Sequence, residues 1–173
     1  ILLINSLDKK NRHRMLPTGF LREPLKNLQR ADFIIFTKSN LIEKESDLIK
    51  VAEYFNIPYS FSTADNNLTN YIQDQQKNVL HLLESKNGYL VSGIGDASSF
   101  KLTASVIAKN IIGYSNLKDH YDYKQSDLNK IIKKSKKLSA DYMLTTEKDW
   151  IKLKHLDSRL PIIPVGLSFN LVK

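Results

Sequence analysis

The feature that most constrains the fold of this sequence is an alternation of short apolar runs with segments whose apolar residues recur at helical spacing. Runs of strand length stand at residues 1–4, 33–36, 57–61, 89–91, 142–144, 162–165 and 167–172. Helical spacing marks residues 48–55, 72–83, 100–111 and 128–135, with short helices expected from Pro24 and from about Asp149. This alternation predicts an α/β/α sandwich with a mostly parallel sheet.

A domain boundary is expected near residues 28–32, after the short helix that Pro24 begins. Residues 1–30 are then the tail of an earlier domain, and residues 31–173 form a nearly complete α/β domain. The first four residues have the composition of a buried strand, and no initiator methionine precedes them. Because chain termini usually lie at the surface, we expect the sequence to be a piece of a longer protein.

Composition narrows the class of protein. A hydrophobic content of 42% and a charged content of 25% are typical of a folded domain, and the lack of cysteine excludes disulfides and thiolate chemistry. No apolar run is long enough to cross a bilayer, and no signal peptide is visible. The net charge of +8 favours an anionic partner, such as nucleic acid, an anionic lipid headgroup or a phosphorylated substrate, without choosing among them.

Polar clusters follow several of the predicted strands. They are Thr37-Lys38, Gly93-Ile94-Gly95-Asp96 and Thr145-Thr146-Glu147-Lys148-Asp149. Because ligands bind outside the carboxyl ends of the strands in open parallel sheets, we expect these clusters to converge on one edge.

Each of the two larger clusters has a structural and a functional interpretation. Gly93 and Gly95 suit a tight turn, with Asp96 as the cap of the next helix, or an anion site at a helix N-terminus. Glu147, Lys148 and Asp149 suit a solvated helix start, or a set of charges that binds substrate or forms ion pairs at a domain interface.

Two further clusters offer groups for chemistry. In Leu21-Arg22-Glu23-Pro24-Leu25, Arg22 is suited to bidentate phosphate contact and Glu23 to Mg²⁺, although a surface ion pair would also explain them. In Asp119-His120-Tyr121-Asp122-Tyr123, His120 is a candidate proton acceptor whose orientation and pKa a neighbouring carboxylate adjusts. The remaining histidines are interpreted as surface residues.

Five lysines, at positions 130, 133, 134, 136 and 137, lie on the outer side of the helix expected near residues 126–138. Most such runs are solvated faces, and a minority bind anionic membrane or nucleic acid. No aromatic residues interleave with them and no nucleic-acid motif is present, so a nucleic-acid partner is not expected. A non-catalytic basic α/β module that binds anionic lipid or nucleic acid is the alternative to an enzyme.

None of the six glycines belongs to a Gly-x-x-x-x-Gly-Lys-Ser/Thr loop, which wraps nucleotide phosphates. The sequence also lacks a Ser-His-Asp elbow and a metal-binding pair of histidines.

Taken in order, the polar segments resemble the tetraacyldisaccharide 4′-kinase family, the lipid A 4′-kinases. The matching segments are Leu16-Pro17-Thr18-Gly19-Phe20-Leu21-Arg22-Glu23-Pro24-Leu25, Gly93-Ile94-Gly95-Asp96 with Phe100, Asp119-His120, and Leu144-Thr145-Thr146-Glu147-Lys148-Asp149 with Lys152-Leu153. The Leu-Arg-Glu-Pro-Leu and Thr-Thr-Glu-Lys-Asp segments are specific, whereas the glycine segment is not.

The resemblance implies an activity and a location. Members transfer the γ-phosphate of ATP, with Mg²⁺, to the 4′-hydroxyl of a tetraacylated glucosamine disaccharide-1-phosphate. They act on the cytoplasmic face of the inner membrane of Gram-negative bacteria, whose anionic surface is a further expected partner. The family fold joins a P-loop α/β/α domain to a smaller α/β/α domain, so residues 1–30 are expected to close the first and residues 31–173 to form the second.

The resemblance also implies roles for single residues. Arg22 would steady phosphate charge, Glu23 would help to hold Mg²⁺, and His120, with Asp119, would orient or activate the sugar hydroxyl. Three departures from the family pattern stand at Asn5, where Asp is usual, in the basic loop before Leu16, and at Leu117-Lys118, where Phe-Pro is usual. The P-loop and the Asp-Asp-Gly-Phe-Gln segment of the family are absent, so this chain alone is expected to be inactive.

Overall fold

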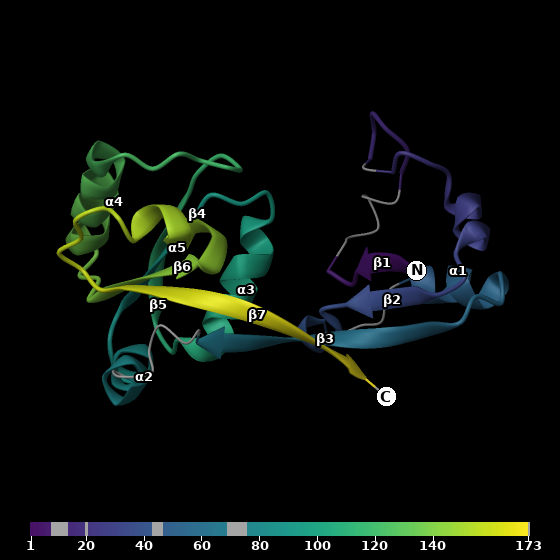
Figure 1. Cartoon of the computed structure of the whole chain (residues 1–173), viewed down its shortest axis with the longest axis horizontal. Helices are drawn as coiled ribbons and strands as arrows, with labels where there is room; N and C mark the ends of the chain where they lie inside the picture. The colour runs from purple at the N-terminus through teal and green to yellow at the C-terminus, as the bar shows by residue number, and fades with distance from the viewer. Residues whose placement is uncertain (8–13, 20, 43–46, 69–75, 173) are drawn as a thin grey trace. The chain divides into compact units, whose positions relative to one another are not determined.

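The computed structural model describes residues 1–7, 14–19, 21–42, 47–68 and 76–172 (Figure 1). Within these residues the chain has the predicted α/β fold with a mostly parallel sheet, and hydrogen bonding orders the strands β1-β2-β3-β7-β6-β4-β5. The residues group into two compact units. The first unit contains Ile1–Asp65 and Ser168–Lys173, and the second unit contains Asn66–Leu167.

The elements follow the predicted alternation. The strands are β1 (Leu2–Asn5), β2 (Ile34–Thr37), β3 (Tyr59–Leu68), β4 (Gly88–Ser92), β5 (Ile111–Asn116), β6 (Tyr142–Thr146) and β7 (Ile162–Val172). The α-helices are α1 (Leu48–Tyr54), α2 (Gln76–Ser85), α3 (Ala97–Ile107), α4 (Gln125–Lys137) and α5 (Glu147–Leu153). Short 3-10 helices span Leu25–Arg30 and Ser39–Leu41.

In the first unit, β1, β2 and β3 are parallel, and Ile34 pairs with both Leu2 and Tyr59. The Ser60 hydroxyl donates to the Val172 carbonyl at 3.0 Å, and the Ser168 hydroxyl donates to the Asp65 carbonyl at 3.5 Å. These pairs run in opposite directions along the sequence, so the end of β7 lies antiparallel to β3. The core of this unit contains Ile4, Ile34, Phe36, Leu48, Ile49, Ala52 and Ile57.

The strand at residues 1–4 is less buried than its composition suggests. Ile4 is buried, whereas Ile1 and Leu3 are 82% and 65% exposed. Within the described residues this strand is therefore only partly buried. β1 stands at the end of their strand order, and side chains of a strand alternate between two faces.

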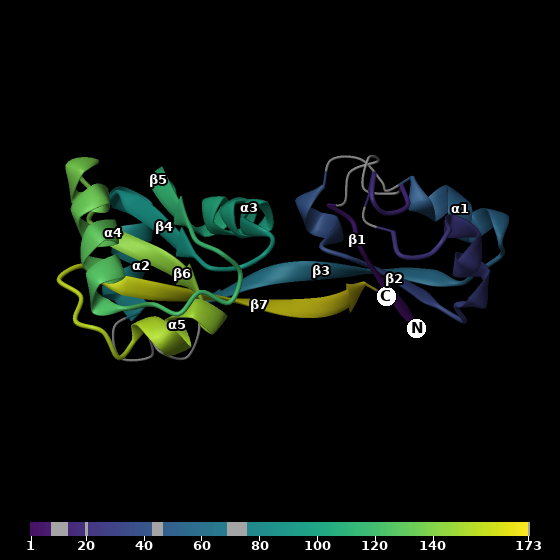
Figure 2. The same cartoon turned by 90° about the horizontal axis from the view of Figure 1, so that it is seen from above.

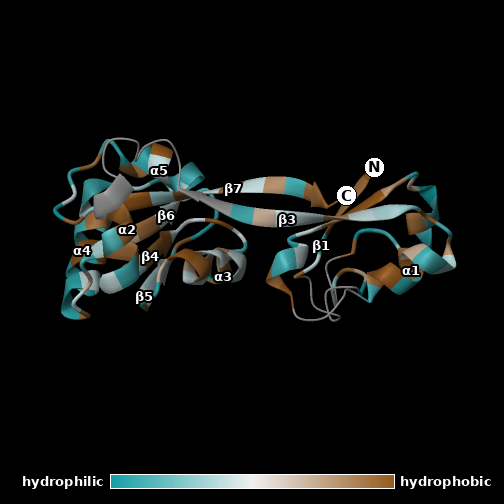
Figure 3. Cartoon of the chain, turned by 90° about the horizontal axis from the view of Figure 1, so that it is seen from below, coloured by the Kyte–Doolittle hydropathy of each residue, from teal (hydrophilic) through white to brown (hydrophobic). Residues whose placement is uncertain are grey.

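In the second unit, β4 lies between β5 and β6, all parallel, and every residue of β4 is buried. Leu90 packs in one core with α2 and α3, while Tyr89 and Val91 pack in another with α4 and α5. Figure 2 shows α3 and α5 on opposite sides of these strands, and Figure 3 shows apolar residues along β4 and β6. The second unit is thus a three-layer α/β/α arrangement.

Helices α3 and α2 differ in part from the helices that the sequence predicts. Helical spacing was expected to continue from Phe100 to Ile111, but α3 ends at Ile107, and Ile111 begins β5. Val79 and Leu83 are buried on α2, as expected, while Leu80 is exposed; Ile72 lies outside the described residues.

The compact units do not coincide with the predicted division at residue 31, because residues 31–65 group with residues 1–30. The assignment of these segments to the two domains of a kinase stays a prediction.

The tight packing of β4 against β6 yields a stability prediction for Gly88. A Cβ at this position would lie 2.8 Å from the Cζ and hydroxyl oxygen of Tyr142, a ring with no exposed surface. Gly88→Ala is therefore expected to lower the free energy of unfolding by about 1–3 kcal/mol, measured by urea denaturation. Gly95→Ala is the matched control, since its Cβ would meet nothing closer than 3.6 Å. Equal losses in the two variants would contradict the packing argument.

Candidate functional site

Three of the segments singled out in the sequence meet beyond the carboxyl ends of β4 and β6 in the second unit. Gly93 directly follows β4, Thr146 ends β6 and caps α5, and His120 lies in the loop between β5 and α4. The predicted convergence of the Gly93–Asp96 and Thr145–Asp149 segments is therefore confirmed. Thr37 and Lys38 follow β2 in the first unit.

Asp149 holds this arrangement together. Its side chain is only 1% exposed, and Oδ2 accepts hydrogen bonds from the backbone N–H of Gly93 at 2.9 Å and from the Thr146 hydroxyl at 2.8 Å. The N–H of Asp149 donates in turn to Thr146 Oγ1 at 3.1 Å, which is the usual N-cap contact. A buried carboxylate thus connects the loop after β4 to the first turn of α5.

The other two charged residues of this segment differ from Asp149 in their exposure to solvent. Glu147 and Lys148 are exposed, so the interpretation of a solvated helix start holds for them and is wrong for Asp149. In the neighbouring loop, Asp96 caps α3, because its Oδ1 accepts from the N–H of Ser99 at 3.1 Å. The predicted capping role of Asp96 is confirmed.

Gly93 is required by close packing. The chain bends at residues 94–95, and no described glycine has a positive φ, so this turn does not depend on a left-handed glycine. A Cβ on Gly93 would lie 3.1 Å from Asp149 Oδ1 and from the Cβ of Tyr121, and 3.2 Å from the Tyr123 hydroxyl. Gly95 has no such crowding, and the atom nearest to its added Cβ would be Oδ2 of Asp119.

His120 is held by its backbone and leaves its imidazole exposed. Its N–H donates to the Gly93 carbonyl at 3.1 Å and to Asp119 Oδ1 at 3.0 Å. Its φ of 60° lies in the left-handed region, which is uncommon for residues other than glycine and is often found at functional sites. Two hydrogen bonds, from Gly93 to Asp149 and from His120 to Gly93, therefore set the position of the His120 backbone.

Lys148 and Asp119 surround the imidazole of His120. Lys148 Nζ lies 3.5 Å from His120 Nε2 and 3.8 Å from Asp119 Oδ1, and Asp119 Oδ2 lies 3.9 Å from His120 Nε2. All three side chains are at least half exposed. The group combines a base, a carboxylate and an ammonium within reach of solvent, so it can accept a proton and contact an anionic oxygen.

Two tyrosines and a lysine lie next to these residues in the loop after His120 and on α5. The rings of Tyr121 and Tyr123 pack edge to face with centroids 5.3 Å apart, and Lys152 of α5 donates to the Tyr121 carbonyl at 2.6 Å. Burial, and after it the negative charge of Asp149, raises the pKa of the buried Tyr123 hydroxyl well above its ordinary value. Tyr123 therefore stays protonated beside the carboxylate.

Sequence reasoning assigned no role to Thr146 or Lys152 in this cluster. A signal for Thr146 was present, because Thr followed three residues later by an acidic residue at a strand end is typical of a helix cap. No signal in the sequence indicated that Lys152 would reach the Tyr121 carbonyl, since that contact depends on how α5 packs.

Arg22 and Glu23 lie in the first unit, where they line a hollow of about 490 Å³ with Leu2, Leu28 and Asp32 among its other residues. Glu23 does not pair with Arg22. Its Oε2 accepts from Asn27 Nδ2 at 2.9 Å and forms an ion pair with Arg30. Arg22 is exposed and has no ion-pair partner among the described residues.

The surroundings of Glu23 do not fit a Mg²⁺ ligand. Mg²⁺ is bound by oxygen atoms in octahedral geometry, whereas the guanidinium of Arg30 already neutralises this carboxylate. Across residues 1–7, 14–19, 21–42, 47–68 and 76–172, no group of three or more His, Asp or Glu side chains could hold a metal ion. The metal-binding role of Glu23 stays a prediction that this arrangement does not favour.

Comparison with known proteins decides the family. The family model described as "LpxK: Tetraacyldisaccharide-1-P 4'-kinase" matches residues 1–172. The chain belongs to this kinase family. The resemblance inferred from the four sequence segments is thereby confirmed.

Individual relatives of this chain agree with the family match. The tetraacyldisaccharide 4′-kinase of Halothermothrix orenii is 27% identical over 99% of this chain and 50% of its own length. The enzymes of Leptospira biflexa and Rickettsia typhi are 34% and 30% identical over 80% and 90% of this chain, and over 42% and 44% of their own lengths. The chain thus spans about half the length of the curated relatives it matches.

A solved structure agrees with the fold. The crystal structure of "apo" form LpxK from Aquifex aeolicus in complex with ATP is 22% identical, with a TM-score of 0.57 over 99% of this chain and 48% of that chain. In the described part of this LpxK-family chain, no helix has the length and apolar character needed to cross a membrane.

Proposed function

We propose that this chain is part of a kinase that transfers the γ-phosphate of ATP to the 4′-hydroxyl of tetraacyldisaccharide-1-phosphate in lipid A biosynthesis. The observation that carries the proposal is the family match over residues 1–172. The ATP bound in the related crystal structure supports ATP as the phosphate donor. We further propose that the protein works as a peripheral protein on the cytoplasmic face of the bacterial inner membrane, where its acyl-chain-bearing substrate resides.

The proposed chemistry assigns the acceptor side of the reaction to the His120 cluster, which consists of His120, Asp119 and Lys148. Phosphoryl transfer depends mainly on positioning and on stabilising negative charge. The exposed imidazole of His120 orients the sugar hydroxyl and accepts its proton, and the Asp119 carboxylate at 3.9 Å stabilises the resulting imidazolium. The Lys148 ammonium contacts a nearby phosphate oxygen. Arg22, which lies in the first unit, is proposed separately to contact phosphate through its guanidinium in bidentate geometry.

The proposal is tested by measuring transfer of radiolabelled phosphate from ATP to tetraacyldisaccharide-1-phosphate. The whole protein is expected to contain a P-loop, because the family resemblance implies one for the kinase reaction. A protein that includes that segment is expected to turn over, whereas the 173-residue chain alone is not. A whole protein without a P-loop, or one that phosphorylates a different acceptor, would contradict the proposal.

A further inference from the structure

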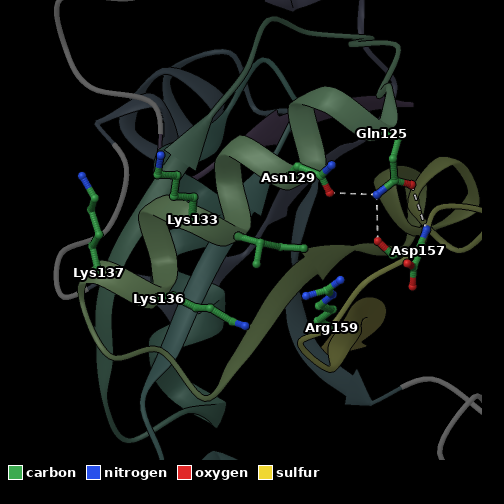
Figure 4. A pocket seen from close by; sticks show the side chains of 8 residues that line it. Gln125, Asn129, Lys133, Lys136, Lys137, Asp157 and Arg159 are labelled. Atoms are coloured by element: carbon green, nitrogen blue, oxygen red, sulfur yellow. Dashed lines mark hydrogen bonds between the residues drawn. The ribbon is translucent and has the colours of Figure 1, made fainter.

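A basic hollow of about 790 Å³ lies in the second unit between α4 and the segment that follows α5 (Figure 4). It carries four cationic side chains and one carboxylate. The lining residues are Gln125, Asn129, Ile132, Lys133, Lys136, Lys137, Asp157 and Arg159. None of these residues belongs to the His120 cluster, so the hollow is a separate feature of this unit.

Hydrogen bonds of the Gln125 side chain connect the two segments that line the hollow. The Gln125 amide donates to the Asp157 carbonyl and accepts from the Asp157 N–H, both at 2.9 Å. The same amide donates to Asn129 Oδ1 at 3.0 Å, which keeps the glutamine side chain on α4. The segment carrying Arg159 is therefore tied to the first turn of α4, as the dashed lines in Figure 4 show.

The four cations of the hollow outnumber its single carboxylate, that of Asp157. Within the described residues, Lys133, Lys136, Lys137 and Arg159 have no ion pair or side-chain hydrogen bond, although Asp157 lies nearby. Lys134 differs, since its ammonium donates to the Tyr114 carbonyl at 3.5 Å. Figure 4 shows Lys136 directed toward Arg159. Lys133 and Lys137 are directed away from Arg159, so the like charges that approach each other are those of Lys136 and Arg159. A bound anion would stabilise such a pair.

The chemistry of the lining favours phosphate. The planar guanidinium of Arg159 matches phosphate oxygens in bidentate geometry, and lysine ammonium groups add point charges. Among the described residues that line the hollow, none is aromatic, so none could stack on a nucleic-acid base. The buried face of α4 contains Leu128, Ile131, Ile132 and Ser135, so the opposite face presents its lysines to solvent as a row beyond the hollow. Such a row suits a plane of many phosphates better than a single soluble one.

We propose that the hollow and the adjoining lysines of α4 bind the phosphate groups of anionic lipid headgroups at a membrane surface. This binding belongs to the chain itself and needs no reacting group, so it goes beyond the proposed kinase reaction. Failure to bind vesicles would leave the kinase proposal untouched, because vesicle sedimentation measures binding and no turnover.

The test is sedimentation of the 173-residue chain with vesicles of phosphatidylcholine that contain phosphatidylglycerol, at low ionic strength. The variant Lys133→Gln/Lys136→Gln/Arg159→Gln is expected to bind roughly 100-fold more weakly, since each basic side chain near an anionic surface contributes about fivefold. The control Lys50→Gln/Lys86→Gln/Lys109→Gln removes the same charge from exposed lysines elsewhere and is expected to lose less than about threefold. Binding of the unmodified chain is expected to weaken as salt is added.

Several outcomes would overturn the proposal. These are equal losses in the two triple variants, equal binding to vesicles of phosphatidylcholine alone, and binding of inorganic phosphate by calorimetry without any binding to vesicles. A single-stranded oligonucleotide that binds more tightly than the vesicles, and is lost in the same variant, would assign the hollow to nucleic acid instead. Circular dichroism checks folding, and the single variants Lys136→Gln and Arg159→Gln, each expected to lose about fivefold, replace the triple variant if it unfolds.

Discussion

Replacing His120 with alanine is expected to lower the kcat of the active kinase by roughly 100- to 10,000-fold, the range usual for loss of a general base. The imidazole is exposed, lies beside Asp119 and Lys148, and contributes no packing to the core. The effect should therefore appear in turnover and leave the free energy of unfolding nearly unchanged. Phosphate transfer and urea denaturation, measured on the same preparations, separate the two quantities.

Two variants control for effects other than loss of the imidazole. His120→Asn keeps a residue that tolerates the left-handed backbone at φ 60°, so it should lose turnover as His120→Ala does. His155→Ala removes an exposed histidine outside the cluster and is expected to keep normal turnover. Normal turnover in His120→Asn would contradict the proposed role, and so would an equal loss in His155→Ala.

Asp149→Ala is expected to lower the free energy of unfolding by about 2–5 kcal/mol, because it leaves two donors without their acceptor in a buried place. These donors are the Gly93 N–H and the Thr146 hydroxyl. The loss also releases the loop whose Gly93 carbonyl holds the His120 backbone. Asp149 is thus expected to act on turnover through position, and the hydrogen-exchange rate of the Gly93 and His120 amides should rise in the variant.

Neighbouring substitutions test this explanation. Glu147→Ala changes an exposed carboxylate in the same turn of α5 and is expected to alter stability by less than about 0.5 kcal/mol. Asp149→Asn keeps one acceptor oxygen in a side chain of similar size. Its free energy of unfolding should therefore lie between those of Asp149→Ala and Glu147→Ala. It can be measured in place of Asp149→Ala if that variant does not fold. Equal stability of the Asp149→Ala and Glu147→Ala variants would show that the buried carboxylate has no structural role.

The parts of the fold that could be predicted are those in which burial leaves a strong pattern. The strands around Ile34, Leu90 and Leu144 are short apolar runs because both of their faces are covered. Strand β5 stands at the end of the strand order, and its residues are only partly buried. Its pattern is correspondingly weak, which is why Ile111 was assigned to the preceding helix.

The division into units could not be predicted for a different reason. Residues 168–172 of β7 pair with β3 of the first unit, while the beginning of β7 pairs with β6 of the second. An apolar strand pattern indicates that a segment pairs, but it does not indicate which strand becomes its neighbour. That choice depends on the packing of the whole chain.

The sequence by itself determined the α/β class and the family, because these depend on periodicity and on local motifs such as Leu-Arg-Glu-Pro and Asp-His. Only the tertiary structure decided which groups touch: Asp149 binds the Gly93 loop and so places His120, Glu23 pairs with Arg30, and Arg159 joins the lysines of α4. Hydrogen bonds and ion pairs act over a few ångströms. Their partners are therefore set by how strands and helices pack, which local spacing along the chain does not encode.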